Sequence, residues 1–350
     1  MCQQRRRVGG NAASASEVAH KPMRIVLWAT FAKPELTARL GAVLGGGLAV
    51  VADAAELDAA VGEAEALLCP DFLYGAEVAE TMRTRAKRLR WLQLLTQGFE
   101  NAQAHGVPAG VIVTNAGEAY SPAVAMHAVA LMLAVQRRFP PMLANQLKGE
   151  WNRTMGLAMT SPAGGTVAIL GFGSIGQEIA RLVRAFGARV VALTRSAKPH
   201  ALADESLPIA QLRQVLPRAD AIVLALPLGG STRHLIGARE FALCRRTAVL
   251  VNISRGGVVD TAALAEALQS GVIAGAGLDV TDPEPLPAGH ALWAAPNLLI
   301  SPHLAGAAGK AGFDRLAEVA ARNVQRFLAG EPLAHVVMGE HAGPRTGSDP

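Results

Sequence analysis

The sequence has only three cysteines, and none lies where a disulfide scaffold or a zinc site would need it. Cys2, Cys69 and Cys244 are far apart and form no Cys-x-x-Cys pair, which is typical of a reducing compartment. The histidines show no ligand spacing with cysteine or aspartate, so we predict no metal. No run of about 18 apolar residues occurs, and residues 1–22 lack the apolar stretch of a signal peptide. We therefore expect a cytoplasmic protein without a membrane partner.

Aromatic and charged residues are also scarce, at 4% and 17% of the chain. The net charge of +5 lies mostly in residues 1–22, where four basic residues and one acidic residue contribute +3 and leave +2 for the rest. No aromatic pattern for base stacking accompanies the one internal basic run. We interpret that run as a solvated helix face and turn rather than a phosphate or nucleic-acid site, and expect no nucleic-acid partner; it contains Arg83, Arg85, Lys87, Arg88 and Arg90.

Apolar residues make up 51% of the chain, which indicates a folded globular protein and excludes a disordered chain or a charge-rich coiled coil. At roughly 150 residues per domain, the length of 350 residues predicts about two domains. β-like and helical segments alternate in two series, a pattern that predicts parallel sheets with helices on both faces. The first series has a helix at 34–44 and β-like segments at 23–29, 48–52, 66–69, 89–96 and 111–115. The second series has helices and six β-like segments, TVAIL, RVVALT, AIVLALP, TAVLVNIS, AGLDV and LLISP.

A long apolar helix, expected from Pro122 to about Arg138, separates the two series and is placed to bridge two domains. Pro140, Pro141 and the Gly-, Pro-, Ser- and Thr-containing stretch 148–165 predict an irregular arm. Helical periodicity returns at 313–328.

A glycine motif, Gly171-Phe172-Gly173-Ser174-Ile175-Gly176, joins the strand at 166–170 to an amphipathic helix. In that context Gly171 permits the tight turn, Gly173 lets the backbone approach a dinucleotide pyrophosphate, and Gly176 lets helix and strand pack closely. The helix N-terminus, including Ser174 and Ile175, then offers free N–H groups to the anion. The alternative is a turn that merely uses glycine; the strand and helix on either side favour the cofactor site.

The next strand ends without the carboxylate that would hold the ribose 2′-hydroxyl of NAD. Thr194 occupies that position, 18 residues beyond Gly176, and Arg195 and Ser196 follow it. A guanidinium matches a 2′-phosphate. The sequence therefore predicts NADP(H) in preference to NAD(H), the alternative being that Arg195 is a solvated loop arginine.

Three later strand-like segments each end in a polar residue: Arg255 in VLVNISRGG, Glu284 in AGLDVTDPEP and His303 in LLISPHLAG. Taken singly, each has an ordinary structural explanation: Arg255 as a residue that caps a turn, and Glu284 and His303 as turn residues beside prolines. The carboxyl ends of strands in an open α/β sheet meet at one edge, where ligands bind. We therefore expect the three side chains to share a site.

These segments, in this order and spacing, resemble the D-isomer-specific 2-hydroxyacid dehydrogenase family. The resemblance extends from about Leu89 to about Leu328 and rests on GFGSIG, ALP at 225–227, NISRGGVVD, GLDVTDPEP and SPHLAG. It implies that Arg255, Glu284 and His303 are catalytic, that Asp279 lies near the nicotinamide carboxamide, and that Pro227 contacts the nicotinamide side.

Each implied catalytic role agrees with the chemistry of reducing a 2-keto acid. A permanently charged arginine orients the acid and polarises its carbonyl. Histidine, whose ordinary pKa is about 6.5, supplies the proton that the carbonyl oxygen needs. A neighbouring carboxylate favours the imidazolium and orients the ring.

The resemblance also implies a backbone site for the substrate carboxylate in the loop Gln97-Gly98-Phe99, with Arg255 and His303 completing the substrate site. Gln97 and Phe99 replace the small residues expected there. Met126 replaces the glutamate that often precedes the histidine at position 127 in the family. Substrate identity is therefore the least constrained inference.

The expected fold is α/β, with two Rossmann-like domains whose sheets are parallel, and the nucleotide-binding domain inserted in a discontinuous substrate domain. The expected activity is NAD(P)H-dependent reduction of a small 2-keto acid, glyoxylate or hydroxypyruvate, to the D-2-hydroxy acid, in a homodimer with the 140–165 region as its contacting arm. One alternative is a phosphite- or formate-type dehydrogenase; formate dehydrogenases lack the glutamate at the position of Glu284, which argues against a formate dehydrogenase. The other alternative is a nucleotide-sensing protein similar to corepressors. The predicted boundaries are a disordered leader at 1–22, a substrate domain at 23–122 plus 306–337, a dinucleotide-binding domain at 123–305 and a disordered tail at 338–350.

Overall fold

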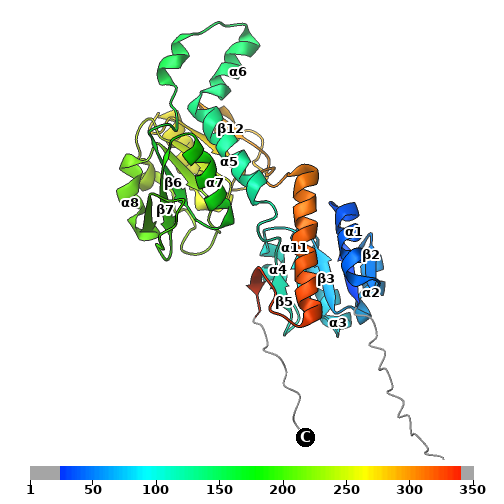
Figure 1. Ribbon diagram of the computed structural model, residues 1–350. Helices are drawn as coiled ribbons and strands as arrows, with labels where there is room; N and C mark the ends of the chain where they lie inside the picture. The colour runs from blue at the N-terminus through cyan, green and yellow to red at the C-terminus, as the bar shows by residue number, and fades with distance from the viewer. Residues whose placement is uncertain (1–23, 340–350) are drawn as a thin grey trace, which may run out of the picture.

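The computed structural model describes residues 24–339, which form two α/β lobes, each built on one sheet (Figure 1). The predicted leader and most of the predicted tail lie outside these residues. Met338, which the sequence assigned to the tail, is instead the last residue of a strand. It was missed because a three-residue strand is too short to give a periodic signal.

The first sheet has six strands in the order β13-β5-β4-β3-β1-β2. β1 to β5 are mutually parallel, whereas β13 pairs antiparallel with β5. The strands are β1 (Ile25–Trp28), β2 (Leu48–Val51), β3 (Ala66–Cys69), β4 (Trp91–Leu94), β5 (Ile112–Thr114) and β13 (Val336–Met338). The helices that accompany them are α1 (Lys33–Leu44), α2 (Ala54–Ala60), α3 (Ala76–Arg85), α4 (Glu100–His105) and, packed beside α1, α11 (Gly309–Ala329).

The second sheet has seven parallel strands in the order β12-β11-β10-β9-β6-β7-β8. The chain builds outward from β6 to β8 and then crosses back to β9, so the strand order reverses between β6 and β9, the position where such sheets bind ligands. The strands are β6 (Thr166–Leu170), β7 (Arg189–Thr194), β8 (Glu205–Pro208), β9 (Ala221–Leu224), β10 (Val249–Asn252), β11 (Gly275–Leu278) and β12 (Leu298–Ile300). Their helices are α7 (Ser174–Ala185), α8 (Leu212–Val215), α9 (Ala238–Phe241) and α10 (Thr261–Gln269).

The prediction of six strands in the second series omitted β8. This strand has the sequence ESLP, is half-buried throughout and lies at the sheet edge. An edge strand needs no continuous apolar run, and proline is tolerated there. Five of the six predicted strands lie inside the sheet and are mostly buried, and the sixth, β12, is the half-buried strand at the opposite edge.

The long apolar helix predicted between the lobes is α5 (Ser121–Gln136), which packs on α7, β10 and β11. The helix that follows it, α6 (Phe139–Lys148), was wrongly predicted to be irregular because of Pro140 and Pro141. Both prolines lie in its first turn, where no intrahelical N–H bond is lost. Figure 1 shows α6 projecting away from both lobes.

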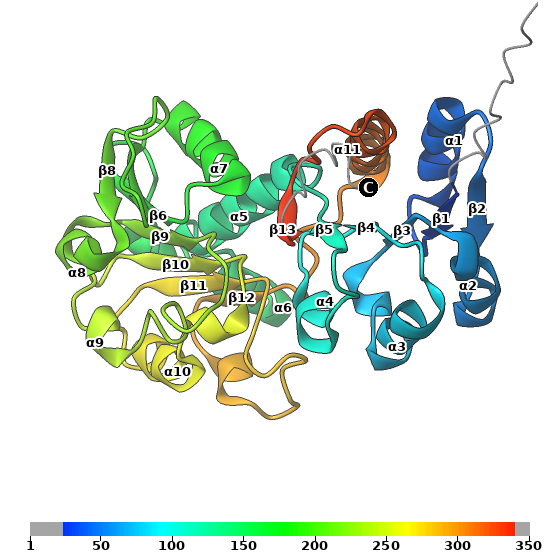
Figure 2. The same ribbon diagram turned by 90° about the horizontal axis from the view of Figure 1, so that it is seen from below.

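The predicted fold class is confirmed: both lobes are α/β with a parallel sheet, interrupted only by antiparallel β13 in the first. The chain leaves the first sheet after β5, builds the whole second sheet, and returns with α11 and β13, and Figure 2 shows the two sheets side by side. No helix in the described part of the chain is long and apolar enough to cross a membrane.

Candidate active site

The glycine motif forms the turn from β6 into α7, at the point where the strand order reverses. Gly171 has a φ of 91°, and a Cβ atom there would lie 2.3 Å from the carbonyl oxygen of Ala225 at the end of β9. A Cβ on Gly176 would lie 2.2 Å from the oxygen of Gly171. Both positions therefore require glycine, as the motif predicts.

The face of this turn that a pyrophosphate would approach is open. A Cβ on Gly173 would meet no described atom within 4 Å, and no side chain caps the N-terminus of α7. The hydroxyl of Ser121, at the start of α5, donates a hydrogen bond to Ser174 Oγ over 2.9 Å. The turn thus combines free backbone N–H groups with a fixed position, which fits a dinucleotide pyrophosphate.

Arg195 and Ser196 are exposed immediately after β7, beside the glycine turn. Thr194 Oγ1 accepts a hydrogen bond from the amide of Ala197, which fixes the turn that presents Arg195. Within residues 24–339, the Arg195 guanidinium has no hydrogen bond or ion pair. It is therefore available to an external anion.

Arg255 follows β10 in a turn that buried Asn252 holds at both ends. Asn252 Nδ2 donates to the oxygen of Arg255 over 3.0 Å, and its Oδ1 accepts from the Ser254 amide. The next residue, Gly256, packs so closely on the 281–282 backbone that a Cβ would lie 2.0 Å from Thr281. The loops that carry Arg255 and Glu284 are therefore direct neighbours.

His303 and Glu284 form the one direct contact among the three predicted catalytic side chains. His303 Nδ1 lies 2.6 Å from Glu284 Oε1, and the side chains are 52% and 41% exposed. Glu284 Oε2 also accepts from the Thr281 amide. A hollow of about 360 Å³, lined partly by Trp293 and Ile300, adjoins the pair. The histidine ring is thus oriented by a carboxylate and remains open to a small ligand.

Asp279 fixes the segment that contains His303. Its carboxylate accepts hydrogen bonds from Ser301 Oγ (2.7 Å) and from the amides of Leu304 (2.8 Å) and Ala305 (3.0 Å), and it is 2% exposed. His303 has a φ of 55°, a conformation that costs a non-glycine residue about 1–2 kcal/mol. In this structure the Asp279 carboxylate therefore holds the histidine loop.

His127 joins this network, although the sequence gave it no role. Its Nε2 lies 2.8 Å from Ser301 Oγ, whose own proton is donated to Asp279. His127 Nε2 therefore carries a proton and donates it to Ser301. The contact brings α5 and the end of β12 together across 174 residues, a separation that no local pattern predicts.

The predicted substrate loop follows β4 and is held from three sides. The amide of Asp71 donates to Thr96 Oγ1, Asn115 Nδ2 donates to the Gln97 oxygen, and Tyr120 donates to the Leu95 oxygen. Gln97 has an exposed side chain, whereas Phe99 packs against the core of the first lobe. Phe99 therefore offers its backbone, not its ring, to a ligand in this loop.

Arg255 reaches across to this loop and pairs with Glu100, the first residue of α4. Arg255 Nε lies 2.7 Å from Glu100 Oε1, and Arg255 Nη1 donates to the Ser254 oxygen. Partial burial acts to raise the pKa of Glu100, but the hydrogen bond and charge of Arg255 outweigh it, and the net pKa lies below the ordinary value. Glu100 is therefore ionised at neutral pH.

Comparison with known proteins shows which family has this sequence and fold. Residues 129–305 match the family model described as "D-isomer specific 2-hydroxyacid dehydrogenase, NAD binding domain". A glyoxylate reductase of Thermococcus gammatolerans is 39% identical over 254 residues, which cover 70% of this chain and 75% of the relative. The chain belongs to the D-isomer-specific 2-hydroxyacid dehydrogenase family. It is accordingly an NAD(P)-dependent oxidoreductase that acts on CH–OH donors.

Two solved structures of D-isomer-specific 2-hydroxyacid dehydrogenases and their relatives share the fold. A family protein from Aeromonas salmonicida matches with a TM-score of 0.79 and 28% identity, over 91% of this chain and 99% of that one. An NADPH-dependent glyoxylate/hydroxypyruvate reductase from Sinorhizobium meliloti, solved with NADP and sulfate, matches with a TM-score of 0.75 and 26% identity, over 90% and 98%.

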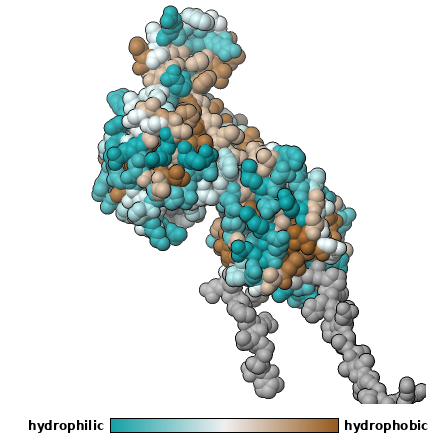
Figure 3. Space-filling view, in the orientation of Figure 1, coloured by the Kyte–Doolittle hydropathy of each residue, from teal (hydrophilic) through white to brown (hydrophobic). Residues whose placement is uncertain are grey.

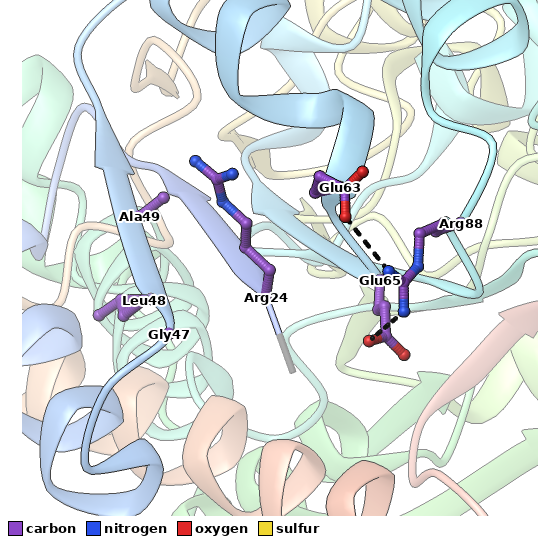
Figure 4. A pocket seen from close by; sticks show the side chains of 7 residues that line it. All are labelled: Arg24, Gly47, Leu48, Ala49, Glu63, Glu65 and Arg88. Carbon is purple, nitrogen blue, oxygen red and sulfur yellow. Dashed lines mark hydrogen bonds and ion pairs between the residues drawn. The ribbon is translucent and has the colours of Figure 1, made fainter. Parts of the chain in front are cut away.

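A second hollow in this dehydrogenase lies away from the glycine turn, at the amino ends of β1 to β3. It has a volume of about 400 Å³, and Figure 4 shows Arg88 between Glu63 and Glu65 at its wall. Ligands of parallel α/β sheets bind at the opposite, carboxyl edge. The basic run that contributes Arg88 is neutralised by acidic partners: Arg83 pairs with Glu80, Arg85 with Asp58, and Arg90 with Glu65.

The described residues of this dehydrogenase contain neither a metal-binding cluster nor a reactive thiol. Residues 24–339 contain no group of three or more His, Cys, Asp or Glu side chains arranged to hold a metal ion. Burial raises the pKa of the Cys69 thiol and raises that of Cys244 to about 12. Both sulfurs are therefore protonated thiols at neutral pH.

Proposed function

We propose that the enzyme reduces glyoxylate or hydroxypyruvate, with NADPH as the preferred cofactor, to the D-2-hydroxy acid. The observation that carries this proposal is the His303–Glu284 hydrogen bond, which lies at the same edge of the second sheet as the glycine turn. The glyoxylate reductase relative supports the substrate. From the sequence we propose the domain boundaries 23–122 with 306–337, and 123–305; the return of the chain to the first sheet supports this division, with β13 extending the first domain to Met338.

The proposed roles follow from position and charge. Arg255 binds the substrate carboxylate and polarises its carbonyl. His303 donates a proton to the carbonyl oxygen, and Glu284 stabilises the charged ring before that transfer. The backbone of the Gly98 loop binds the substrate carboxylate from the other lobe. NADPH, when bound, supplies the hydride, and its pyrophosphate is assigned to the backbone of residues 171–176, with Pro227 and Asp279 on the nicotinamide side.

The test of this function is a spectrophotometric screen of NADPH oxidation with five 2-keto acids: glyoxylate, hydroxypyruvate, pyruvate, phenylpyruvate and 2-ketoglutarate. We expect the highest kcat/KM with glyoxylate or hydroxypyruvate. A chiral assay of the product from hydroxypyruvate establishes the D configuration. Absence of turnover with all five acids, in a protein that binds NADPH, contradicts the proposed activity.

We expect Arg195→Ala to weaken NADPH binding by about 10- to 100-fold while leaving NADH nearly unchanged, because one charge-assisted hydrogen bond to the 2′-phosphate is lost. The exposed, unpaired guanidinium and the NADP in the Sinorhizobium structure support this assignment. The measurement is the dissociation constant of each cofactor by fluorescence titration. Arg239→Ala, which removes an exposed arginine on α9, is the control, and equal affinity of the wild-type protein for both cofactors contradicts the prediction.

We propose that the arm, the 140–165 region, contacts a second copy of the chain in a homodimer. No residue of α6 is buried, and three apolar side chains of the arm are at least 90% exposed, Leu147, Trp151 and Leu157. Figure 3 shows hydrophobic side chains on this projection. Such a surface is typical of an interface between subunits.

We expect Leu147→Glu to weaken self-association by at least roughly 10-fold, because a charge enters an apolar contact. Sedimentation velocity over a concentration series measures the change. Leu328→Glu, at an exposed leucine of α11, provides the control. If the wild-type protein is monomeric throughout the series, the arm has no such role.

A further inference from the structure

Glu100 lies where the substrate carboxylate is expected. Its Oε1 is 2.7 Å from Arg255 Nε. A Cβ built on Gly98 would lie 2.5 Å from Glu100 Oε2 and 2.8 Å from Arg255 Nη2. The carboxylate and the guanidinium therefore both lie against the Cα of Gly98, between the substrate loop and the arginine that we assign to substrate binding.

We propose that Glu100 is a specificity-determining residue, which restricts the enzyme to small 2-keto acids with a single carboxylate. This inference rests on the proposed function, because it assumes that Arg255 receives the carboxylate next to the keto group. The first carboxylate of the substrate displaces Glu100 from Arg255, and the displaced Glu100 repels a second carboxylate.

The Glu100 side chain has the room to move that this role requires. Glu100 is 61% exposed, whereas Arg255 is 32% exposed and is also tied to Ser254. In the described part of the chain Glu100 has no ion-pair partner except Arg255. When a substrate takes its place on Arg255, Glu100 turns toward solvent, while α4 keeps it at the edge of the pocket.

The charges around the pocket favour one carboxylate. Arg255 and protonated His303 contribute two positive charges, and Glu100 and Glu284 contribute two negative charges. The first carboxylate of a keto acid binds Arg255. A second carboxylate near Glu100 meets its negative charge, and the repulsion between partly screened charges several ångströms apart amounts to about 10-fold in binding.

A purely supporting role for Glu100 predicts a different result. If Glu100 only oriented Arg255, its removal would lower kcat for every substrate by the same factor. A specificity role instead changes the ratio between substrates that differ in charge. The matched pair is 2-ketoglutarate and 2-ketohexanoate, which have about the same length and differ in the second carboxylate.

The experiment compares the wild type with Glu100→Gln, Glu100→Asp and the control Glu77→Gln, an exposed glutamate in the first turn of α3. For Glu100→Gln we expect the kcat/KM ratio of 2-ketoglutarate to 2-ketohexanoate to rise about 10-fold. We also expect its KM for glyoxylate to fall, because no carboxylate then competes with the substrate for Arg255. Glu100→Asp and Glu77→Gln should keep the wild-type ratio.

An unchanged ratio in Glu100→Gln, or an equal loss of kcat for both acids, overturns the proposal. A binding measurement separates this failure from failure of the proposed function. With NADPH present, thermal unfolding is followed against acetate and malonate, which are a mono- and a dicarboxylate. Even if the wild type reduces no keto acid, Glu100→Gln should raise the affinity for malonate relative to acetate about 10-fold, and an unchanged ratio refutes the role.

Discussion

The His303→Ala enzyme should turn over glyoxylate roughly 100- to 10,000-fold more slowly than the wild type, because the general acid that protonates the carbonyl oxygen is removed. Within residues 24–339, the ring that is lost has one hydrogen bond, between Nδ1 and Glu284 Oε1 over 2.6 Å. NADPH binding should be nearly unaffected, since the glycine turn at 171–176 is built by β6, α7 and β9. Stopped-flow measurement of NADPH oxidation, with fluorescence titration of the cofactor, separates the two effects.

The pH profile gives this prediction a second readout. Because the proposed mechanism needs a proton on His303 before hydride transfer, reduction by the wild type should be slower in alkaline than in neutral solution. The decline should be absent from the residual activity of His303→Ala. His105→Ala, at an exposed histidine on α4, is the control, and wild-type turnover by His303→Ala rules out His303 as the acid.

Replacing Arg255 with lysine should lower kcat/KM for glyoxylate by about 100- to 1,000-fold, because removal of one charge-stabilising donor alone costs on the order of 10²–10³ in rate. Both KM and kcat should change. An ammonium group cannot reproduce the planar fork that here donates through Nε and Nη1 in different directions.

Steady-state kinetics of Arg255→Lys should be compared with Arg246→Lys, which alters an exposed arginine before β10. The control should behave as the wild type does. Thermal unfolding should show that Arg255→Lys remains folded, since Asn252 holds this turn through the backbone. An unchanged KM for the keto acid would show that Arg255 does not bind its carboxylate.

The second sheet and its site motifs could be predicted from the sequence because local chemistry determines them. A Cβ atom at Gly171 or Gly176 would collide with backbone atoms, so this turn requires glycine at both positions. The strands that precede Arg255, Glu284 and His303 are parallel, two of them fully buried and the third half-buried, and they therefore appear as apolar runs followed by polar residues.

Other features depend on contacts between distant segments, and their local patterns are weak. β8 was missed because an edge strand need not be apolar, and α6 because its prolines match a loop as well as a first turn. Glu100 was given no role of its own from the sequence because its importance comes from Arg255, 155 residues later. Its only local signal is its position directly after the Gly98 loop.

The return of the chain to the first sheet has a consequence for motion. Two covalent segments join the lobes, one between β5 and α5 and the other between β12 and α11. A body attached at two points rotates most freely about the line through them, so we expect any opening or closing of the lobes to follow that axis. His303 lies in the second segment, anchored by Asp279 to the end of β11. Rotation about that axis therefore changes the gap between Arg255 and the Gly98 loop while the acid stays fixed to the cofactor-binding lobe.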